Sequence, residues 1–207
     1  MEPLVDIVLS TYDGAAHLEA QLASLRAQSH QNWRLIARDD GSSDATAAIL
    51  ATFAADDVRV VILPAGGSAS GPVAAFGAAL AHSDAPYFMF CDQDDVWLPQ
   101  KISAMLLKMI ADEHHDQPCL VHSDMQVVDE NLSEIAPSFW ARQNLTVEGI
   151  TVGPLLLRNV VTGCAMMGNA ALRDAMTPIP EAAIMHDWWA TLVATQLGQV
   201  IAVPEPL

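Results

Sequence analysis

Basic residues are scarce in this sequence. Only 9 of the 207 residues are Lys or Arg, against 25 Asp and Glu, and the formal net charge is −16. A protein that binds duplex nucleic acid neutralises phosphates with many Lys and Arg side chains, so the composition argues against that class of function. With so few cations, an anionic small-molecule ligand would call for a divalent metal ion as an intermediary.

Cysteine is rare as well. Cys91, Cys119 and Cys164 lie far apart in the sequence and form no CxxC pair, which excludes the usual zinc patterns and favours reduced thiols in a cytoplasmic protein. The N-terminal segment MEPLVDIVLS has an acidic residue where a signal peptide has basic ones. The longest uncharged stretch, after Arg59, is interrupted by prolines and glycines between residues 64 and 72, so no membrane-spanning helix is expected there. Peripheral association with a membrane stays open.

Hydrophobic residues make up 52% of the chain, which allows a sizeable core at a length typical of one domain. In the first hundred residues, apolar segments typical of buried strands alternate with segments of helical spacing. The expected strands are residues 4–10, 33–40, 58–63 and 86–91, and the expected helices lie near residues 18–25, 44–55 and 72–82. This alternation predicts an α/β fold with a Rossmann-like, mostly parallel sheet flanked by helices, here as a single domain.

The second half of the chain has a less regular pattern. The expected elements there are a helix from Pro99, a strand over 118–124, a helix-like segment over 152–159, a strand-like segment over 160–168 and a helix over 186–197 that ends at Gly198. The chain contains neither GxGxxG nor GxxxxGK[ST]. A dinucleotide site of the Rossmann type and a phosphate-binding P-loop are therefore unsupported.

Acidic residues directly follow two of the expected strands. Asp39 and Asp40 come at the end of the second strand, and Asp92, Asp94 and Asp95 follow the fourth, within FMFCDQDDVWLPQK. The carboxyl ends of parallel strands meet at one edge of a sheet, and ligands bind at that edge. The sequence therefore predicts a binding site there.

Asp92 and Asp94 are candidate metal ligands, because Mg²⁺ and Mn²⁺ take one or two protein carboxylates and complete their shell with phosphate and water. A bare DxD is also common in solvated turns, in which Asp95 would help to cap the following helix. Taken alone, this stretch favours the turn.

The segment HDWW, at the start of the last expected helix, also has two interpretations. Asp187 fits a helix N-cap, which spacing alone favours, or a general base desolvated by Trp188 and Trp189. His122 and Asp124, at the end of another expected strand, either line the same cleft or satisfy each other's hydrogen bonds.

The order of the motifs is more specific than any one of them. STYDG follows the first strand, RDDGSSDAT the second and FCDQDDVWLPQK the fourth, and VTGCAMMGNAAL and HDWWATLVATQLGQVIAVPEPL come later. Together they resemble the family-2 inverting glycosyltransferases of the GT-A fold, and most closely the bacterial rhamnosyltransferase-like members, in which DQDDxW and HDWW are typical. The resemblance spans essentially residues 1–207.

This resemblance implies a nucleoside-diphosphate sugar donor, with dTDP-rhamnose as the leading candidate, and a glycan or lipid-linked acceptor in surface polysaccharide biosynthesis. Asp187 would be the catalytic base, and Asp94 together with Asp92 would hold Mg²⁺ or Mn²⁺. One of Asp39 and Asp40 would meet the nucleobase. The implied nucleotide-sugar-binding residues are Ser10, Thr11, Tyr12, Asp39, Asp40, Asp92, Gln93, Thr162, Gly163 and Cys164.

Two features depart from the family pattern. Ala75-Phe76 stands where the family usually has Asn-Phe, and the sequence ends at VPEPL, before the usual YRxH-like segment, so a truncation at the C-terminus is expected. Two other functions stay open from the residues. One is a sugar-1-phosphate nucleotidyltransferase, although STYDG lacks the expected Gly- and Arg-rich loop, and the other is a non-catalytic nucleotide-sugar-binding domain.

Overall fold

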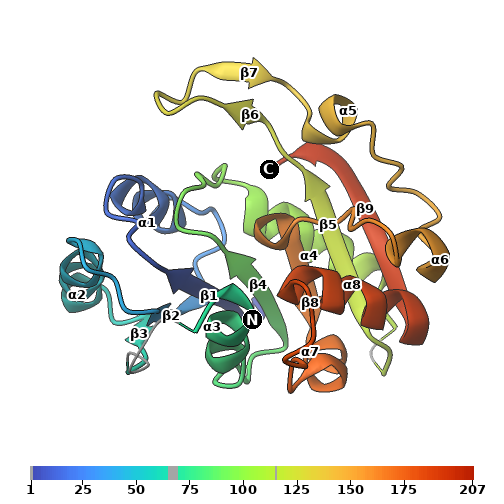
Figure 1. The fold of residues 1–207 in the computed structure, drawn as a ribbon, viewed down its shortest axis with the longest axis horizontal. Helices are drawn as coiled ribbons and strands as arrows, with labels where there is room; N and C mark the ends of the chain where they lie inside the picture. Colours follow the sequence, from blue (N-terminus) through green and yellow to red (C-terminus); the bar gives the residue numbers. More distant parts are fainter. Residues whose placement is uncertain (1, 65–69, 115) are drawn as a thin grey trace.

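A seven-stranded sheet forms the centre of the computed structural model, which describes residues 2–64, 70–114 and 116–207 (Figure 1). The strand order is β3-β2-β1-β4-β8-β5-β9, and β8 runs antiparallel to both of its neighbours. The strands are β1 (Val5–Thr11), β2 (Trp33–Asp39), β3 (Val60–Ile62), β4 (Tyr87–Cys91), β5 (Cys119–Asp124), β8 (Met166–Asn169) and β9 (Gln199–Pro206). Gly66 and Gly67, in the expected loop after the third strand, lie outside the described residues.

Helices cover both faces of this sheet. They are α1 (Leu18–Arg26), α2 (Thr46–Asp56), α3 (Pro72–Leu80), α4 (Lys101–Asp112), α5 (Phe139–Gln143), α6 (Val152–Leu155), α7 (Ala170–Met176) and α8 (His186–Leu197). Successive side chains of a strand point to opposite faces. Ile7 and Leu9 of β1 therefore pack in the core with α1, α2 and α4, whereas Val8 packs in a second core with α3, α7 and α8.

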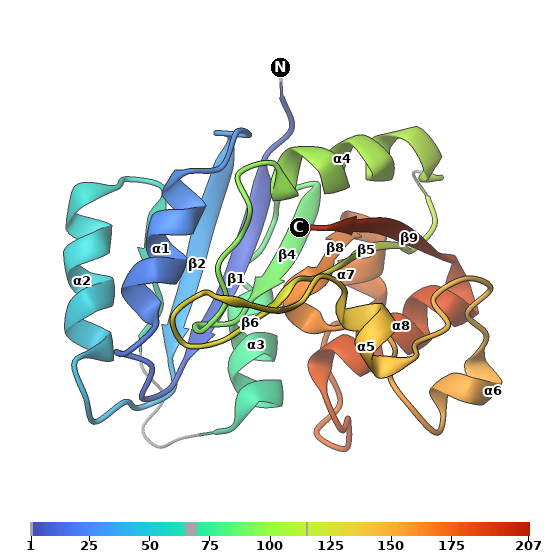
Figure 2. The ribbon, with the colours of Figure 1, turned by 90° about the horizontal axis from the view of Figure 1, so that it is seen from above.

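A small antiparallel hairpin, β6 (Val127–Val128) and β7 (Glu134–Ala136), projects beyond the end of β5 (Figure 1). Both views place α1 and α2 at one end of the molecule and α6 at the other (Figures 1 and 2). Among the described residues, no helix is long and apolar enough to cross a bilayer.

The α/β architecture with a mostly parallel sheet is confirmed, and three details differ from expectation. α4 begins at Lys101 and not at Pro99, so Asp95 precedes its N-cap residue and does not cap it. The strand expected over 160–168 is confined to β8, which follows a 3₁₀ turn at Gly163–Ala165. β9 forms an edge strand that the pattern did not predict.

A buried carboxylate connects the three strands that end at the acidic loops. Asp6 of β1 accepts two hydrogen bonds from Arg34 of β2, each 2.8 Å long. It also accepts from the hydroxyl of Ser83 at 2.9 Å and from the backbone N–H groups of Asp84 and Ala85 at 3.1 Å, in the turn that leads to β4. Asp6 is fully buried, so these partners replace the water that its charge has lost.

Replacing Asp6 with Ala should lower the free energy of unfolding by about 3–5 kcal/mol, because a guanidinium and three further donors lose their buried acceptor. The matched control is Asp84→Ala, which removes the other carboxylate partner of Arg34. The Asp84 side chain is 82% exposed. This control should cost less than about 1 kcal/mol. Urea denaturation measures both variants, and equal losses would contradict the anchoring role of Asp6.

Candidate active site

The loops after β1, β2 and β4 are held together by side-chain hydrogen bonds. Thr11 pairs with Asp39 in the sheet register, and its hydroxyl donates to the Asp39 carboxylate at 2.9 Å. The Gln93 side chain accepts from the backbone N–H of Tyr12 at 2.9 Å and donates to its carbonyl at 3.0 Å. A Cβ at Gly14 would lie 2.1 Å from the Gln93 amide oxygen, so any side chain there would displace the Gln93 amide from these two hydrogen bonds. Gln93 therefore joins the loop after β4 to the loop after β1.

Asp39 and Asp40 are both buried and satisfy backbone donors. Asp39 also accepts from the N–H of Ser42 at 3.0 Å and from its hydroxyl, whereas Asp40 accepts from the N–H groups of Ser70 and Gly71 at 2.7 and 2.9 Å. Each carboxylate keeps some acceptor capacity for a ligand. The Tyr12 side chain is 52% exposed beside them.

The loop after β4 gathers acidic groups around a buried thiol. One oxygen each of Asp92 and Asp95 and the sulfur of Cys164 lie within 4.8 Å of one another. Burial, together with the charges of Asp95, Asp94 and Asp187, raises the pKa of Asp92 to about 7. Burial also raises the pKa of Asp95. The structure thus brings Asp95 next to Asp92, whereas Asp94 is exposed and lies outside this group.

Lys101 is the buried cation beside this cluster, and sequence reasoning did not select it. Its ammonium lies 4.8 Å from the centroid of the Trp97 ring and donates to the Leu207 carbonyl at 3.3 Å. Burial lowers the pKa of Lys101, while its positive charge offsets part of the upward shift at Asp92 and Asp95. The cluster therefore combines two carboxylates of one loop, Asp92 and Asp95, with a buried ammonium group.

Asp187 lies in the first turn of α8, and the N-cap residue is Met185, so the N-cap interpretation is wrong. The Asp187 carboxylate accepts from the N–H of Gly163 at 2.9 Å and from that of Trp188 at 2.6 Å. Burial raises the pKa of Asp187, whose exposed fraction is 8%. A Cβ at Gly163 would lie 2.9 Å from the ring nitrogen Nε2 of His186, which favours glycine beside this carboxylate.

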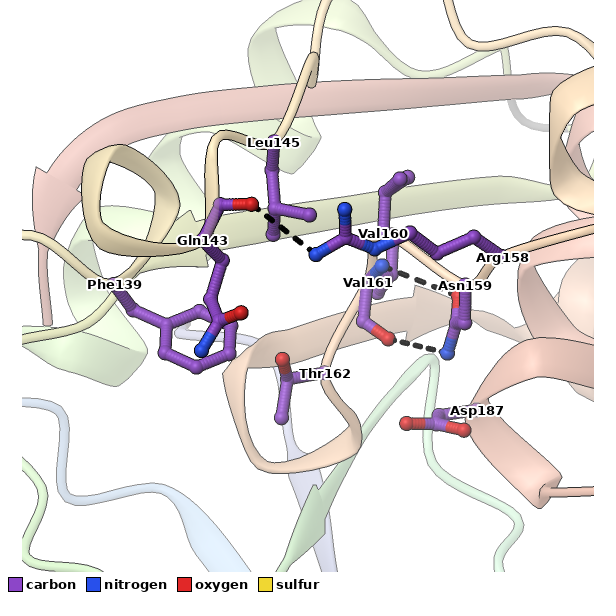
Figure 3. Close-up of a pocket in the computed structure, with 9 residues that line it drawn as sticks. All are labelled: Phe139, Gln143, Leu145, Arg158, Asn159, Val160, Val161, Thr162 and Asp187. Carbon is purple, nitrogen blue, oxygen red and sulfur yellow. Dashed lines mark hydrogen bonds between the residues drawn. The ribbon is translucent and has the colours of Figure 1, made fainter.

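Asp187 and Thr162 line a pocket of about 170 Å³ (Figure 3). Figure 3 shows Asp187 at one side of the pocket and Phe139 at the other, with Arg158 along its upper wall. The remaining lining residues are Gln143, Leu145, Asn159, Val160 and Val161. The sequence motifs pointed to Asp187 and Thr162 but not to this wall, because most of its residues lie in segments 139–145 and 158–160, which belong to none of the motifs.

His122 and Asp124 do not satisfy each other. Asp124 accepts from the N–H groups of Met125 and Trp140 at 2.8 and 3.0 Å and from the Ser138 hydroxyl. Both ring nitrogens of buried His122 lack a partner among the described residues, and burial lowers its pKa to about 4. The pair is therefore part of the scaffold around β5, and neither residue lines the pocket of Asp187.

Arg38 is a second cation that the sequence motifs did not indicate as a site residue. It pairs with Ser10 in the register of β1 and β2, at the edge where both strands end. Its Nε atom is buried and has no hydrogen-bond partner among the described residues. The only signal in the sequence is an arginine directly before the acidic pair, in RDDGSSD.

The profile of the family described as Glycosyl transferase family 2 matches residues 6–175. This range contains the loops after β1, β2 and β4 and the turn at Gly163, but not Asp187. The chain belongs to this family. It is similar to UDP-Glc:alpha-D-GlcNAc-diphosphoundecaprenol beta-1,3-glucosyltransferase WfgD of Escherichia coli, with 27% identity over 78% of this chain and 58% of that protein. It is also similar to the putative teichuronic acid biosynthesis glycosyltransferase TuaG of Bacillus subtilis, with 31% identity over 51% of this chain and 41% of that protein.

Solved structures show the same fold. TarS 1–349 of S. aureus in complex with UDP-GlcNAc superposes with a TM-score of 0.73 and 17% identity, over 96% of this chain and 55% of that one. The mannosyltransferase PcManGT of Pyrobaculum calidifontis, in complex with GDP-Man and Mn²⁺, gives a TM-score of 0.71 and 17% identity, over 99% and 55%. The resemblance to family-2 glycosyltransferases and the GT-A fold are thus confirmed. The chain spans 58% of WfgD, 41% of TuaG and 55% of each of the two solved chains, which is about half the length of the relatives that it matches.

Asp92→Asn should stabilise the metal-free protein at pH 8 by about 1–3 kcal/mol, because it removes a charge from a buried acidic cluster. A raised pKa means that Asp92 binds its proton more tightly in the folded state. Its ionisation therefore costs stability as the pH rises, and the gain from Asn should shrink below pH 7 and be smallest near pH 4.

Urea denaturation in the presence of a chelator measures this gain. Asp94→Asn is the matched control, since Asp94 is exposed on the same loop, and it should change stability by less than about 0.5 kcal/mol. A gain that is the same at pH 4 and pH 8 would rule out the proposed charge effect.

Proposed function

We propose that this chain transfers a sugar, with inversion, from a nucleoside-diphosphate donor to a hydroxyl group of a glycan or lipid-linked acceptor in surface polysaccharide biosynthesis. The observation that carries the proposal is the position of Asp187. Two backbone N–H groups hold its carboxylate at a pocket, and its charge is close enough to raise the pKa of Asp92. A general base and an acidic, diphosphate-side cluster thus share one edge of the sheet.

The reaction is a single displacement at the anomeric carbon. The acceptor hydroxyl forms the new C–O bond while the bond to the diphosphate breaks, and Asp187 takes the hydroxyl proton. Burial raises the pKa of Asp187 and so makes it a stronger base. The N–H groups of Gly163 and Trp188 fix its position, so that it is ready to accept the proton as the new bond forms.

A divalent cation fits the acidic cluster, because Asp92 and Asp95 are crowded and partly desolvated, and a positive ion would offset their repulsion. Asp92 and Asp94 would hold Mg²⁺ or Mn²⁺, for which carboxylate oxygens are preferred ligands. The bound ion would neutralise negative charge on the departing diphosphate. Burial keeps the pKa of the Cys164 thiol high, so this sulfur stays protonated and would not compete as a ligand.

The donor's nucleoside would bind at Ser10, Thr11, Tyr12 and the Asp39–Asp40 pair, and its sugar would bind near Thr162 and Gly163. The choice of dTDP-rhamnose rests on DQDDxW and HDWW alone. The relatives act on other sugars by name: WfgD is named for UDP-Glc, and PcManGT was solved with GDP-Man. Family membership favours sugar transfer over the nucleotidyltransferase alternative. A cytoplasmic location, at the inner face of the membrane for a lipid-linked acceptor, belongs to the same proposal.

Asp187→Asn should reduce transfer by about 10²–10⁴-fold, because the acceptor loses its general base. The assay uses the best donor from a screen of dTDP-rhamnose, UDP-glucose, UDP-galactose and GDP-mannose. Donor binding should change less than about threefold, since Asn keeps the size of the side chain. Asp174→Asn, on the exposed end of α7, is the control and should transfer normally. Normal transfer by Asp187→Asn would show that another group is the base.

Calorimetric titration with dTDP and UDP tests the metal. We expect the affinity for the preferred nucleotide to rise by at least about tenfold with Mn²⁺ or Mg²⁺, and Asp94→Ala to abolish this gain. The same titration of Asp95→Ala tests its neighbour, and loss of the gain in that variant only would move the ligand role to Asp95. Metal-independent affinity would refute the metal site. Metal-dependent binding without transfer from any donor would indicate a non-catalytic binding domain.

A further inference from the structure

An apolar groove lies next to the pocket of Asp187. It has a volume of about 290 Å³, and every residue that lines it is apolar. Its walls come from α6, from α8 and from the loop before α8, and they include Leu155, Trp188 and Trp189. Leu156 and Ile184 line it as well, although they are 67% and 72% exposed. Such exposure of large apolar side chains around a groove marks a binding surface.

The groove and the catalytic pocket share the same two chain segments. Asp187 lines the pocket, and the next residue of α8, Trp188, lines the groove. Likewise Leu155 and Leu156 line the groove, and residues 158–162 line the pocket. The indole N–H of Trp188 donates to the Leu155 carbonyl at 2.6 Å and so fixes the wall between the two hollows. The pocket and the groove are therefore lined by neighbouring residues of the same two segments.

Arg158 lines the pocket and lies close in the chain to the residues of the groove. It follows the groove residues Leu155 and Leu156 in the chain and is itself part of the pocket. Its side chain is exposed, and its guanidinium donates to the Gln143 carbonyl at 3.2 Å. Among the described residues it forms no ion pair with a carboxylate. In a chain with a net charge of −16, this guanidinium is a rare site for an anionic group.

We propose that the groove binds the hydrocarbon chain of a polyprenyl phosphate or diphosphate that carries the acceptor sugar. The acceptor hydroxyl lies at Asp187, the phosphate lies at Arg158 and the first isoprene units lie between Trp188 and Leu156. The order of sugar, phosphate and hydrocarbon in such a lipid matches the order of pocket, guanidinium and groove. This inference rests on the proposed function, since it names the acceptor of the same site.

Binding of farnesyl diphosphate tests the inference without any need for transfer. Titrations followed by tryptophan fluorescence, in the presence of a chelator to exclude metal-assisted binding, compare it with farnesol and inorganic pyrophosphate. We expect farnesyl diphosphate to bind at least tenfold more tightly than either, because only this probe fills the groove and reaches Arg158. Equal affinity for farnesol would refute the role of Arg158, and equal affinity for pyrophosphate would refute the groove.

Leu156→Gln combined with Ile184→Gln should weaken farnesyl diphosphate binding at least tenfold, and Arg158→Ala should lower it to the level of farnesol. Both apolar side chains are largely exposed, so the double variant should fold normally, as circular dichroism would show. The matched control is Val58→Gln combined with Leu132→Gln, two exposed apolar residues that do not line the groove. Unchanged binding by the groove variant, or equal weakening by the control, would overturn the proposal.

Transfer assays separate this inference from the proposed function. With a water-soluble acceptor, the groove variant should match the wild type, whereas with a prenyl-linked acceptor its KM should rise at least tenfold. Absence of all transfer by the wild type would contradict the proposed function and leave the binding result intact. Sedimentation tests whether the groove is a self-association surface. If the groove substitutions only converted a dimer to monomers, with no change in the affinity for farnesyl diphosphate, the proposal would be wrong.

Discussion

The candidate active site depends on the register of β1, β2 and β4, which the buried Asp6 carboxylate fixes at the opposite edge of the sheet. Asp6 pairs with Arg34 and with Phe88 across its two neighbouring strands, and its side chain also bonds the turn before β4. With that register set, Thr11 meets Asp39 at the far end. A shift of one residue would turn every side chain of a strand to the other face. The chemistry at one edge of the sheet thus follows from an ion pair near the other.

The same site stores unfavourable electrostatic energy. Asp92 and Asp95 are partly desolvated beside each other, and Asp187 adds a third negative charge, while Lys101 is the one cation that the structure places next to them among the described residues. Such crowding opposes folding, as functional sites often do. A cation and an anionic ligand that bind only the folded state would restore the lost stability by mass action. The acidity of the chain therefore makes ligand binding and stability interdependent.

Sequence patterns predicted the first half of the molecule better than the rest, for physical reasons. β1, β2 and β4 are mostly apolar segments bounded by polar turns, and their acidic loops had to share one edge of a parallel sheet. β9 escaped detection because Pro204 and Pro206 argue against a strand, yet an edge strand tolerates them. The proximity of Asp95 to Asp92 depends on the conformation of one turn, and the position of Arg158 depends on how the chain folds after the helix-like segment near whose end it lies. Neither position has a signal that sequence alone could supply.

The antiparallel direction of β8 explains how Asp187 comes to lie near the loops after β1, β2 and β4. β8 lies between β4 and β5, so its first residue, and not its last, is at the edge where the parallel strands end. The turn before β8 therefore brings the N–H of Gly163 to that edge, where it meets Asp187. Asp187 is also in the first turn of α8, where the helix dipole favours a negative charge and offsets part of the cost of burial. A reversed strand and a helix N-terminus thus converge on one carboxylate, which places the proposed base between the loops after β1, β2 and β4 and the apolar groove.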